Sequence, residues 1–195
     1  GGASASSGGI VYAGATRQQR ESGIEDTPEQ MFEYLKGETG DAVSHETLGR
    51  FCEESAATLE WLESLGIEYR GDANPPKTSY PKNGVYLYYS GNETIRPFCD
   101  TAKPAPRGHR TVDKGLSGRR LYRGLDEAIS GKNIPFLKQA AVRRLITDEA
   151  GAVIGAEVWQ VPVDATTGRL QRLLTRLIEP FNYMSAGLAD ASRQL

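Results

Sequence analysis

The sequence predicts an α/β fold, of α+β type within these residues, in which helices and short strands lead into a β-meander. Three observations predict this class. Residues 44–65 carry apolar side chains three, four and seven positions apart, which is the spacing of one helix face. Residues 85–89 are β-branched or aromatic, which favours a strand. Residues 134–163 contain strand-like runs around a turn.

The composition is that of a folded protein without a basic surplus. Hydrophobic residues make up 38% and charged residues 25% of the 195 residues, which is typical of a globular chain. The net charge is −2, so we expect no nucleic-acid partner. No apolar run reaches the about 20 residues of a membrane span, and no signal peptide is recognisable, so we expect a cytoplasmic protein. Cys52 and Cys99 form no C-x-x-C motif and are expected to be reduced thiols.

The first part of the chain is expected to hold a loop followed by two helices. Residues 1–16 are uncharged and rich in glycine, which favours a loop and excludes a regular helix. Thr27 is followed by a proline and, three positions later, by a glutamine, a pattern that predicts a helix start. The helix at 44–65 should end at Gly66.

The middle of the chain is expected to hold two strands and a long loop. Residues 67–69 resemble the strand that follows such a helix, and the Asn-Gly pair at 83–84 predicts a turn before the strand at 85–89. Residues 101–118 are rich in glycine, proline and basic residues and have no apolar period. They predict a loop of unusual length, which in a compact domain is often functional.

The last part is expected to contain a helix, the β-meander and a second helix. The first helix should run from Ser117, as its cap, to Gly131. Its inner face would carry Leu121, Leu125 and Ala128. A turn at 148–151 separates the last two of three predicted strands, which are 134–140, 142–147 and 152–163. After residue 168 the pattern is helical again, up to Pro180.

The opening residues have the chemistry of an anion-binding loop. In the pattern Gly-Gly-x-Ser-x-x-Ser-Gly-Gly, glycines let a ligand approach the backbone, and serine hydroxyls can donate to phosphate oxygens. The alternative is a flexible linker, because glycine and serine runs are common in linkers too. The residues of the pattern are Gly1, Gly2, Ser4, Ser7, Gly8 and Gly9.

Together with later segments, this loop resembles a known family. It is similar to the second FAD-contacting loop of the flavoproteins that include fumarate reductase, the succinate dehydrogenase flavoprotein subunit and the 3-ketosteroid dehydrogenases. Further similar segments follow in the family's order, at residues 26–35, 58–66, 106–110 and 145–155. Residues 77–81 and 87–93 resemble the steroid branch most, in particular the enzymes that desaturate 5α-3-ketosteroids.

The resemblance implies a partial FAD-binding domain at residues 1–165, followed by a helical segment at 166–195 that leads toward a substrate-capping part. The family's N-terminal βαβ unit, with its G-x-G-x-x-G motif, is not among these residues, so we expect an internal segment that starts just downstream of it. The implied cofactor is FAD, and no metal is implied. Ser6 departs from the steroid branch, where a larger apolar residue is usual.

Several residues match positions that contact the cofactor or lie near the substrate in the family. The backbone of Val142 would face adenine. His109 and Arg110 match a His-Arg pair of the reductase branch, which could stabilise a developing anion or reduced flavin. The alternative is that Arg107 and Arg110 anchor the loop by bonding to backbone carbonyls. The residues expected along the pyrophosphate and flavin are Gly1, Gly2, Ser4, Ser7, Gly8 and Gly9.

Tyr88 and Tyr89 are candidate substrate contacts. A steroid site needs apolar walls and a phenol that can donate to the 3-keto oxygen or take a proton. The alternative is cross-strand packing, which is a common role of tyrosines on a strand. In the family the catalytic tyrosines come mainly from the capping domain and the C-terminal part, so no catalytic residue is assigned.

The resemblance implies an FAD-dependent oxidoreductase that acts on CH–CH groups and desaturates a 3-ketosteroid. In such an enzyme a hydride passes to flavin N5 while a base takes the neighbouring proton. Within the same class, the alternative is a fumarate-reductase-like enzyme acting on a small unsaturated acid, which His109 and Arg110 would suit. From another class, the chain could be a non-catalytic remnant or binding module. The segment alone is expected to be inactive, and the oligomeric state stays open.

Overall fold

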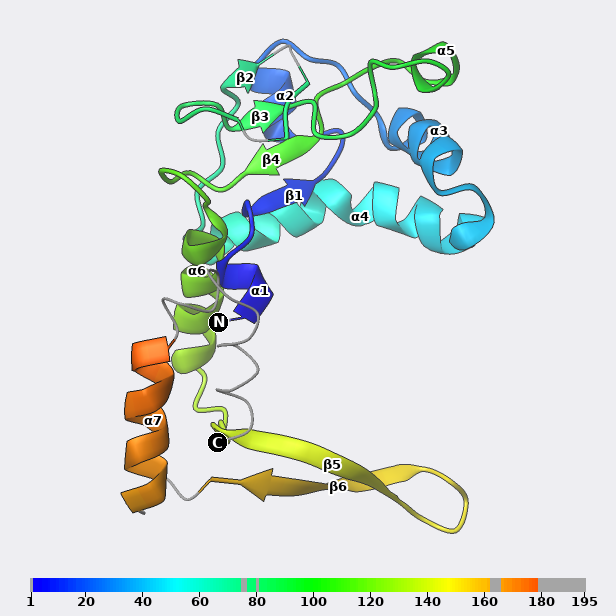
Figure 1. Ribbon diagram of the computed structural model, residues 1–195. Coiled ribbons are helices and arrows are strands. Elements are labelled where there is room, and N and C mark those ends of the chain that lie inside the picture. The colour runs from blue at the N-terminus through cyan, green and yellow to red at the C-terminus, as the bar shows by residue number, and fades with distance from the viewer. Residues whose placement is uncertain (1, 75–76, 80, 162–165, 179–195) are drawn as a thin grey trace. The chain divides into compact units, whose positions relative to one another are not determined.

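The computed structural model describes residues 2–74, 77–79, 81–161 and 166–178 (Figure 1). Two compact units make up the chain, residues 1–134 and residues 135–195. The division into a cofactor-binding part at 1–165 and a helical segment at 166–195 stays a prediction.

Helices and short strands alternate through the first unit, and the second unit has a hairpin and a helix. The first unit contains α1 (Gly2–Ala5), β1 (Ile10–Tyr12), α2 (Arg17–Glu21), α3 (Pro28–Thr39), the 3-10 turn η1 (Gly40–Ala42), α4 (His45–Ser64), β2 (Ala73–Asn74), β3 (Leu87–Tyr88), α5 (Phe98–Thr101), β4 (Gly108–Arg110) and α6 (Gly118–Ser130). The second unit contains β5 (Ala140–Thr147), β6 (Val153–Gln160) and α7 (Thr166–Ile178).

The sheet of the first unit has the order β1-β4-β3-β2. Strand β4 pairs antiparallel with both β1 and β3, so that His109 lies opposite Val11 on one side and Leu87 on the other. Strands β2 and β3 pair in parallel. Because β4 has a neighbour on each side, all three of its residues are buried, although two of them are polar.

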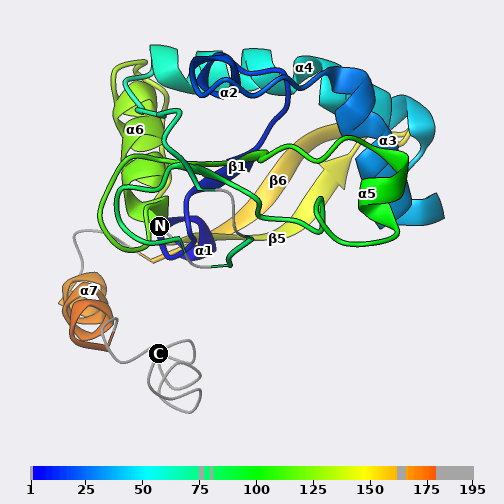
Figure 2. The same cartoon turned by 90° about the horizontal axis from the view of Figure 1, so that it is seen from above.

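The main hydrophobic core joins α4, β1 and α6. Leu59 and Leu62 of α4 pack against Ile67 and Tyr69, which follow the helix. In Figures 1 and 2, α6 lies at one end of α4 and α3 at the other. The core therefore holds both β1, which follows the opening residues in the sequence, and α6, which contacts α1. The half-buried side chains packed against the cluster are Val11, Leu65, Leu121 and Leu125.

The predicted helices are confirmed within the described residues. Thr27 caps α3 by accepting from the Gln30 amide at 3.2 Å, and Ser44 caps α4 by accepting from the Thr47 amide at 3.2 Å. Helix α6 ends at the predicted glycine, and α7 matches the helical pattern after residue 168. None of the described helices has both the length and the apolar content that crossing a bilayer requires. Residues 179–195, with the predicted break at Pro180, lie outside the described residues.

The opening residues differ from the predicted loop. Residues 2–5 form one helical turn, α1, because Ala3 and Ala5 favour helix and the turn is packed against α6. Strand β1 and the short helix α2 then follow within a stretch for which no regular structure was predicted. Thr16 and Gln19 form a capping box at the start of α2, and the T-x-x-Q pattern in the sequence is the signal that predicts it.

Two predictions in the middle of the chain are wrong. Residues 67–69 form no strand, because their described backbone bonds are one from the Ile67 amide back to the Leu62 carbonyl and one from the Val112 amide to the Glu68 carbonyl, which make no ladder. The expected loop at 101–118 contains the end of α5 and the strand β4. The Gly-His-Arg sequence of β4 has no apolar residue, so no hydrophobic pattern marks it. Of the strand predicted at 85–89, residues 87–88 are in β3.

The predicted β-meander is a two-stranded hairpin. Strands β5 and β6 pair antiparallel, and Asp148 closes the predicted turn by accepting from the amides of Ala150 and Ala152. Residues 134–139 form no strand. Pro135 cannot donate a ladder hydrogen bond, and Gln139 has a positive φ of 54°, which interrupts an extended run.

Candidate functional site

The opening loop, residues 2–9, is shaped by hydrogen bonds within itself. The Ser7 amide donates to the Ser4 carbonyl at 3.4 Å, and the Ser7 hydroxyl donates to the same carbonyl at 2.9 Å. The Ser7 hydroxyl also accepts from the Gly9 amide at 3.2 Å. The Ser7 side chain therefore holds the end of α1 to the start of β1.

The end of the opening loop is also held by Thr111, which follows β4, and by the start of α6. The Gly118 amide at the start of α6 donates to the Ser7 carbonyl at 3.0 Å. The Gly9 carbonyl accepts from the amide of Thr111 at 2.9 Å and from its hydroxyl at 3.1 Å. Gly9 has a φ of 65°, in the left-handed region that favours glycine. Segment 7–9 is thus fixed from both sides.

A cavity of about 290 Å³ lies beside this loop. Gly8 and Arg110 both line it, so two of the predicted site residues meet at one place. The volume is just below the range of about 300–1,000 Å³ for ligand pockets, which suits part of a larger ligand. The other lining residues include Ile10, Pro81, Gly115 and Leu116.

Arg110 is buried, and its guanidinium is engaged by the protein itself. Its Nε donates to the Ser117 hydroxyl at 2.9 Å, and it lies over the Tyr86 ring, 5.8 Å from the centroid. Arg110 thus anchors the loop, which was the alternative to a role near the substrate. Its bonds connect β4 with the segment that precedes β3 and with the segment that precedes α6. A contact with substrate stays a prediction. The backbone carbonyls that accept from its terminal nitrogens belong to Pro81, Lys82, Val85, Asp113 and Gly115.

His109 is buried and neutral. Its Nδ1 lies 2.9 Å from the Arg107 carbonyl, which can only accept, so we assign the ring proton to Nδ1. Its Nε2 then accepts from the Thr16 hydroxyl at 2.8 Å. Burial lowers the pKa of His109 to about 4, so the ring carries no charge at neutral pH. The predicted substrate role of His109 stays a prediction, and the structure gives it a clear structural role.

Acid is expected to destabilise the protein through His109. Its pKa is about 4 in the folded chain and about 6.5 in an unfolded one, so between these values the unfolded chain binds more protons. Stability should therefore fall as the pH falls through this window, by at most about 3 kcal/mol. His109→Asn keeps a donor for the Arg107 carbonyl and does not titrate. In denaturant titrations of the full gene product, the variant should lose less stability on acidification than the wild type, and equal losses would contradict this.

Arg107 forms a buried ion pair that sequence reasoning missed. Its Nε and Nη2 donate to the two oxygens of Asp26 at 2.8 and 2.7 Å, and both side chains are at most 1% exposed. Gln19 donates to Asp26 at 3.0 Å and to the Pro106 carbonyl at 3.0 Å. Arg107 is therefore anchored by a carboxylate and not by the backbone carbonyls that were expected. No pattern in the sequence marks Asp26 as its partner.

Tyr88 and Tyr89 differ in accessibility. Tyr88 is fully buried in the sheet, and burial raises its pKa to about 12. Its hydroxyl has no hydrogen-bond partner among the residues that the structure describes. Tyr89 is half-buried, and burial raises its pKa as well. Both phenols are thus protonated at neutral pH, and their contact with a substrate stays a prediction.

Three other residues predicted to contact the cofactor do not line this cavity or are not among the described residues. Val142 is on β5 of the second unit, opposite Val158, and its side chain is 63% exposed. Gly1 lies outside the described residues. Ser4 is exposed at the surface of α1. Contacts of these residues with a cofactor stay predictions.

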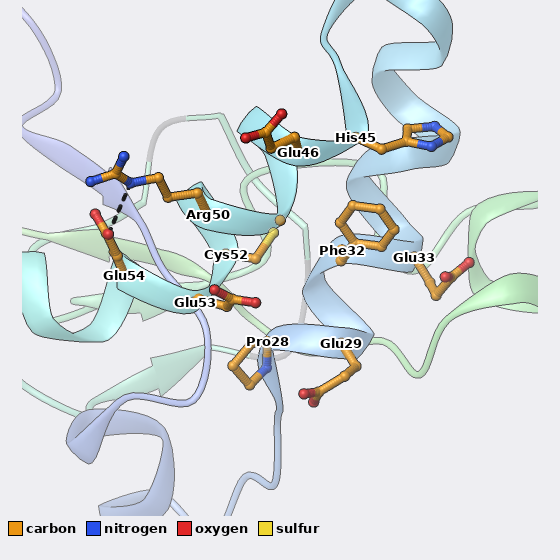
Figure 3. A pocket seen from close by; sticks show the side chains of 11 residues that line it. Pro28, Glu29, Phe32, Glu33, His45, Glu46, Arg50, Cys52, Glu53 and Glu54 are labelled. Atoms are coloured by element: carbon orange, nitrogen blue, oxygen red, sulfur yellow. Dashed lines mark hydrogen bonds and ion pairs between the residues drawn. The ribbon is translucent and has the colours of Figure 1, made fainter.

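A larger hollow, of about 770 Å³, lies between α3 and α4 (Figure 3). Its charged lining includes Arg50 and Glu54, which pair at 3.0 Å along α4. His45, the first residue of α4, lies edge-on to the Phe32 ring at 5.9 Å. Among the described residues no group of three or more His, Cys, Asp or Glu is placed to hold a metal ion. The buried thiol of Cys52 and the half-buried thiol of Cys99 are both free.

The opening loop lies in a stretch of the chain that matches a known protein family. The model of the family described as FAD binding domain matches residues 1–179. The chain belongs to the FAD binding domain family. This confirms the predicted family and FAD as its cofactor.

Known relatives of this FAD-binding domain include two ketosteroid enzymes. It is 42% identical to the 3-oxo-5-alpha-steroid 4-dehydrogenase of Comamonas testosteroni over 178 residues. This match covers 89% of the present chain and 34% of the relative. The crystal structure of the 3-ketosteroid-delta4-(5alpha)-dehydrogenase of Rhodococcus jostii RHA1 with 4-androstene-3,17-dione matches with a TM-score of 0.78 and 30% identity, over 82% of this chain and 35% of that one. The chain thus spans about a third of the length of these relatives.

A third match concerns the fold of the FAD-binding domain. The open conformation of a flavocytochrome c3 fumarate reductase matches with a TM-score of 0.57 and 24% identity, over 77% of this chain and 22% of that one. At this identity the match shows a shared fold alone. The predicted fold class, an α/β fold of α+β type that forms part of an FAD-binding domain, is confirmed by the match to the ketosteroid enzyme.

The opening loop of this FAD-binding domain fits a dinucleotide. Residues 2–9 carry no side chain larger than that of serine, so a ligand can approach the backbone closely. Gly8 lines the cavity, and a Cβ added there would lie 2.8 Å from Cδ1 of Ile10. A larger side chain at position 8 would therefore take up space that a cofactor could use.

Proposed function

We propose that the chain is part of an FAD-dependent dehydrogenase that introduces a double bond into a 3-ketosteroid. The observation that carries this proposal is the 42% identity to a 3-oxo-5-alpha-steroid 4-dehydrogenase, which extends over 89% of the chain. The second ketosteroid relative, crystallised with 4-androstene-3,17-dione, supports the same substrate class. The cytoplasmic location and the oligomeric state stay open to test.

In this proposal the opening loop contacts the pyrophosphate and flavin through Gly2, Ser4 and segment 7–9. When bound, FAD supplies the hydride acceptor of the reaction. The protein's own contribution is a fixed backbone, because the hydrogen bonds from Thr111 and Gly118 hold segment 7–9 in one conformation. A preorganised loop lowers the entropy cost of binding the cofactor.

A substrate contact is proposed for Tyr89 in preference to Tyr88. Tyr88 is 0% exposed, so a ligand cannot reach it without rearrangement of the sheet, whereas Tyr89 is half-buried. Burial raises the pKa of Tyr89, so its phenol keeps its proton at neutral pH. A protonated phenol can donate a hydrogen bond to the 3-keto oxygen and so make the neighbouring C–H more acidic.

The structure gives no support to the small-acid alternative. A carboxylate substrate would need free cationic donors, and His109 is neutral with both ring nitrogens engaged. All three nitrogens of the Arg110 guanidinium donate to the protein itself. Within the described residues, His109 and Arg110 are therefore engaged by the protein itself.

The proposal is tested with two anaerobic experiments on the full gene product. In the first, a saturated 3-ketosteroid is added to the oxidised flavoprotein, and loss of the flavin absorption is followed. In the second, the flavin is chemically reduced and fumarate is added. We expect the steroid to bleach the flavin and fumarate to leave the reduced flavin unchanged. A flavin that no 3-ketosteroid reduces would contradict the proposed substrate, and reoxidation by fumarate would favour the small-acid alternative.

A further inference from the structure

We propose that Ser117 and Gly118, at the start of α6, position the opening loop for FAD, and that Arg110 holds these two residues in place. The inference rests on the proposed contact between the loop and FAD. It assigns positioning roles to residues that the resemblance to known flavoproteins did not mark, apart from Arg110.

The first support is the closeness of Gly118 to the opening loop. Its amide donates to the Ser7 carbonyl at 3.0 Å. A Cβ added at Gly118 would lie 2.6 Å from the Ser7 carbonyl oxygen and closer still to the Ser4 carbonyl oxygen. Both are backbone atoms, which cannot rotate away as a side chain can. A side chain at position 118 would therefore displace the loop.

The second support is the reciprocal closeness of Gly9 to the helix start. A Cβ added at Gly9 would lie 2.6 Å from the carbonyl carbon of Ser117 and 2.7 Å from the amide nitrogen of Gly118. Each backbone thus approaches the other at a glycine. The backbone of the loop is therefore in direct contact with the start of α6 at both glycines.

The third support is the hydrogen bond between the Ser117 hydroxyl and Arg110. A serine before a helix usually accepts from the helix's own amides, but Ser117 makes no such bond. Its hydroxyl accepts from Arg110 Nε at 2.9 Å, and both residues are at most 2% exposed. The buried hydroxyl thus joins the helix start to β4, the strand next to β1, and leaves the first turn of α6 without a side-chain cap.

These contacts form a continuous support for the loop. Arg110 in β4 holds Ser117, and the backbone of residues 117–118 holds Gly9 and Ser7. Ordinary van der Waals contact begins at about 3.4 Å, so a Cβ at Gly118 requires a shift of about 1 Å in the loop backbone. Misplacement by about 1 Å is enough to weaken precise contacts strongly.

The test compares two glycines of the same helix in the full gene product. Gly118→Ala places a methyl group against the loop. Gly124→Ala places one against the buried side chain of Ile67, 2.9 Å from Cδ1, and away from the loop. FAD is removed from each protein, and the FAD dissociation constant, the circular dichroism of the bound flavin and the melting temperature of the apoprotein are measured. Ser117→Ala, which removes the bond from Arg110 without adding a clash, is the milder third variant.

We expect Gly118→Ala to weaken FAD binding about tenfold or more and to change the flavin circular dichroism, and Ser117→Ala to weaken binding several-fold. Gly124→Ala should lower the melting temperature and leave the FAD dissociation constant within about twofold of the wild type. Equal FAD affinities in all four proteins, or equal losses in the two glycine variants, would overturn the positioning role. If Gly118→Ala does not fold, an unchanged affinity in Ser117→Ala overturns it. A wild type that binds no FAD would instead remove the proposed function.

Discussion

Replacing Asp26 with alanine is expected to lower the free energy of unfolding of the full gene product by about 3–5 kcal/mol. The carboxylate accepts two hydrogen bonds from Arg107, at 2.8 and 2.7 Å, and both side chains are at most 1% exposed. Without Asp26, the guanidinium would stay buried without its counter-charge, and its Nη1 already has no hydrogen-bond partner among the described residues. Removing one partner of a buried ion pair costs more than the pair itself contributes.

An exposed pair provides the matched control. Arg50 and Glu54 lie one turn apart on α4, at 3.0 Å, with side chains that are 77% and 61% exposed. Glu54→Ala should lower the free energy of unfolding by less than about 0.5 kcal/mol, because water and salt screen such a pair. Denaturant titrations of the two variants measure both values. Similar losses for Asp26→Ala and Glu54→Ala would contradict the role assigned to the buried pair.

Replacing Gly8 with valine is expected to weaken FAD binding by about tenfold or more, with a small change in the stability of the apoprotein. Gly8 lines the cavity beside the opening loop, so the added side chain would enter space assigned to the cofactor. The nearest atom to an added Cβ is Cδ1 of Ile10, at 2.8 Å. Ile10 is 38% exposed and can move, so the fold can accept the change.

Gly49→Val is the control for this variant. Gly49 lies in α4, and a Cβ added there meets nothing within 4 Å. Titration of each apoprotein with FAD, followed by the fluorescence change of the flavin, gives the dissociation constants. Gly49→Val should bind FAD as the wild type does. An equal affinity in Gly8→Val would show that the cofactor does not occupy the cavity edge at position 8.

The sequence predicts elements whose apolar residues follow a period. Helix α4 buries Leu48, Cys52, Leu59 and Leu62, and this spacing is the pattern that predicts the helix. Capping residues marked the starts of α3 and α4 correctly because their side chains act on amides two or three residues away. The opening loop was assigned to its family only together with the later segments that resemble it, and the family is confirmed.

The sequence could not predict elements whose burial depends on polar partners far along the chain. His109 is buried because Thr16 satisfies its ring, and Arg107 is buried because Asp26 neutralises it. These partners are 93 and 81 residues away, and the sequence around β4 contains no pattern that indicates them. Arg110 also donates to the Ser117 hydroxyl and to backbone carbonyls that the sequence around it does not indicate, and its contact with a substrate stays a prediction.

The most direct test of the account is the visible absorption spectrum of the purified full gene product, recorded before and after anaerobic addition of a saturated 3-ketosteroid. We expect the absorption bands of oxidised flavin, release of FAD on denaturation, and loss of those bands when the steroid is added. A protein that stays colourless after incubation with FAD would contradict its role as an FAD-dependent enzyme. A flavoprotein whose spectrum no 3-ketosteroid changes would contradict the proposed reaction.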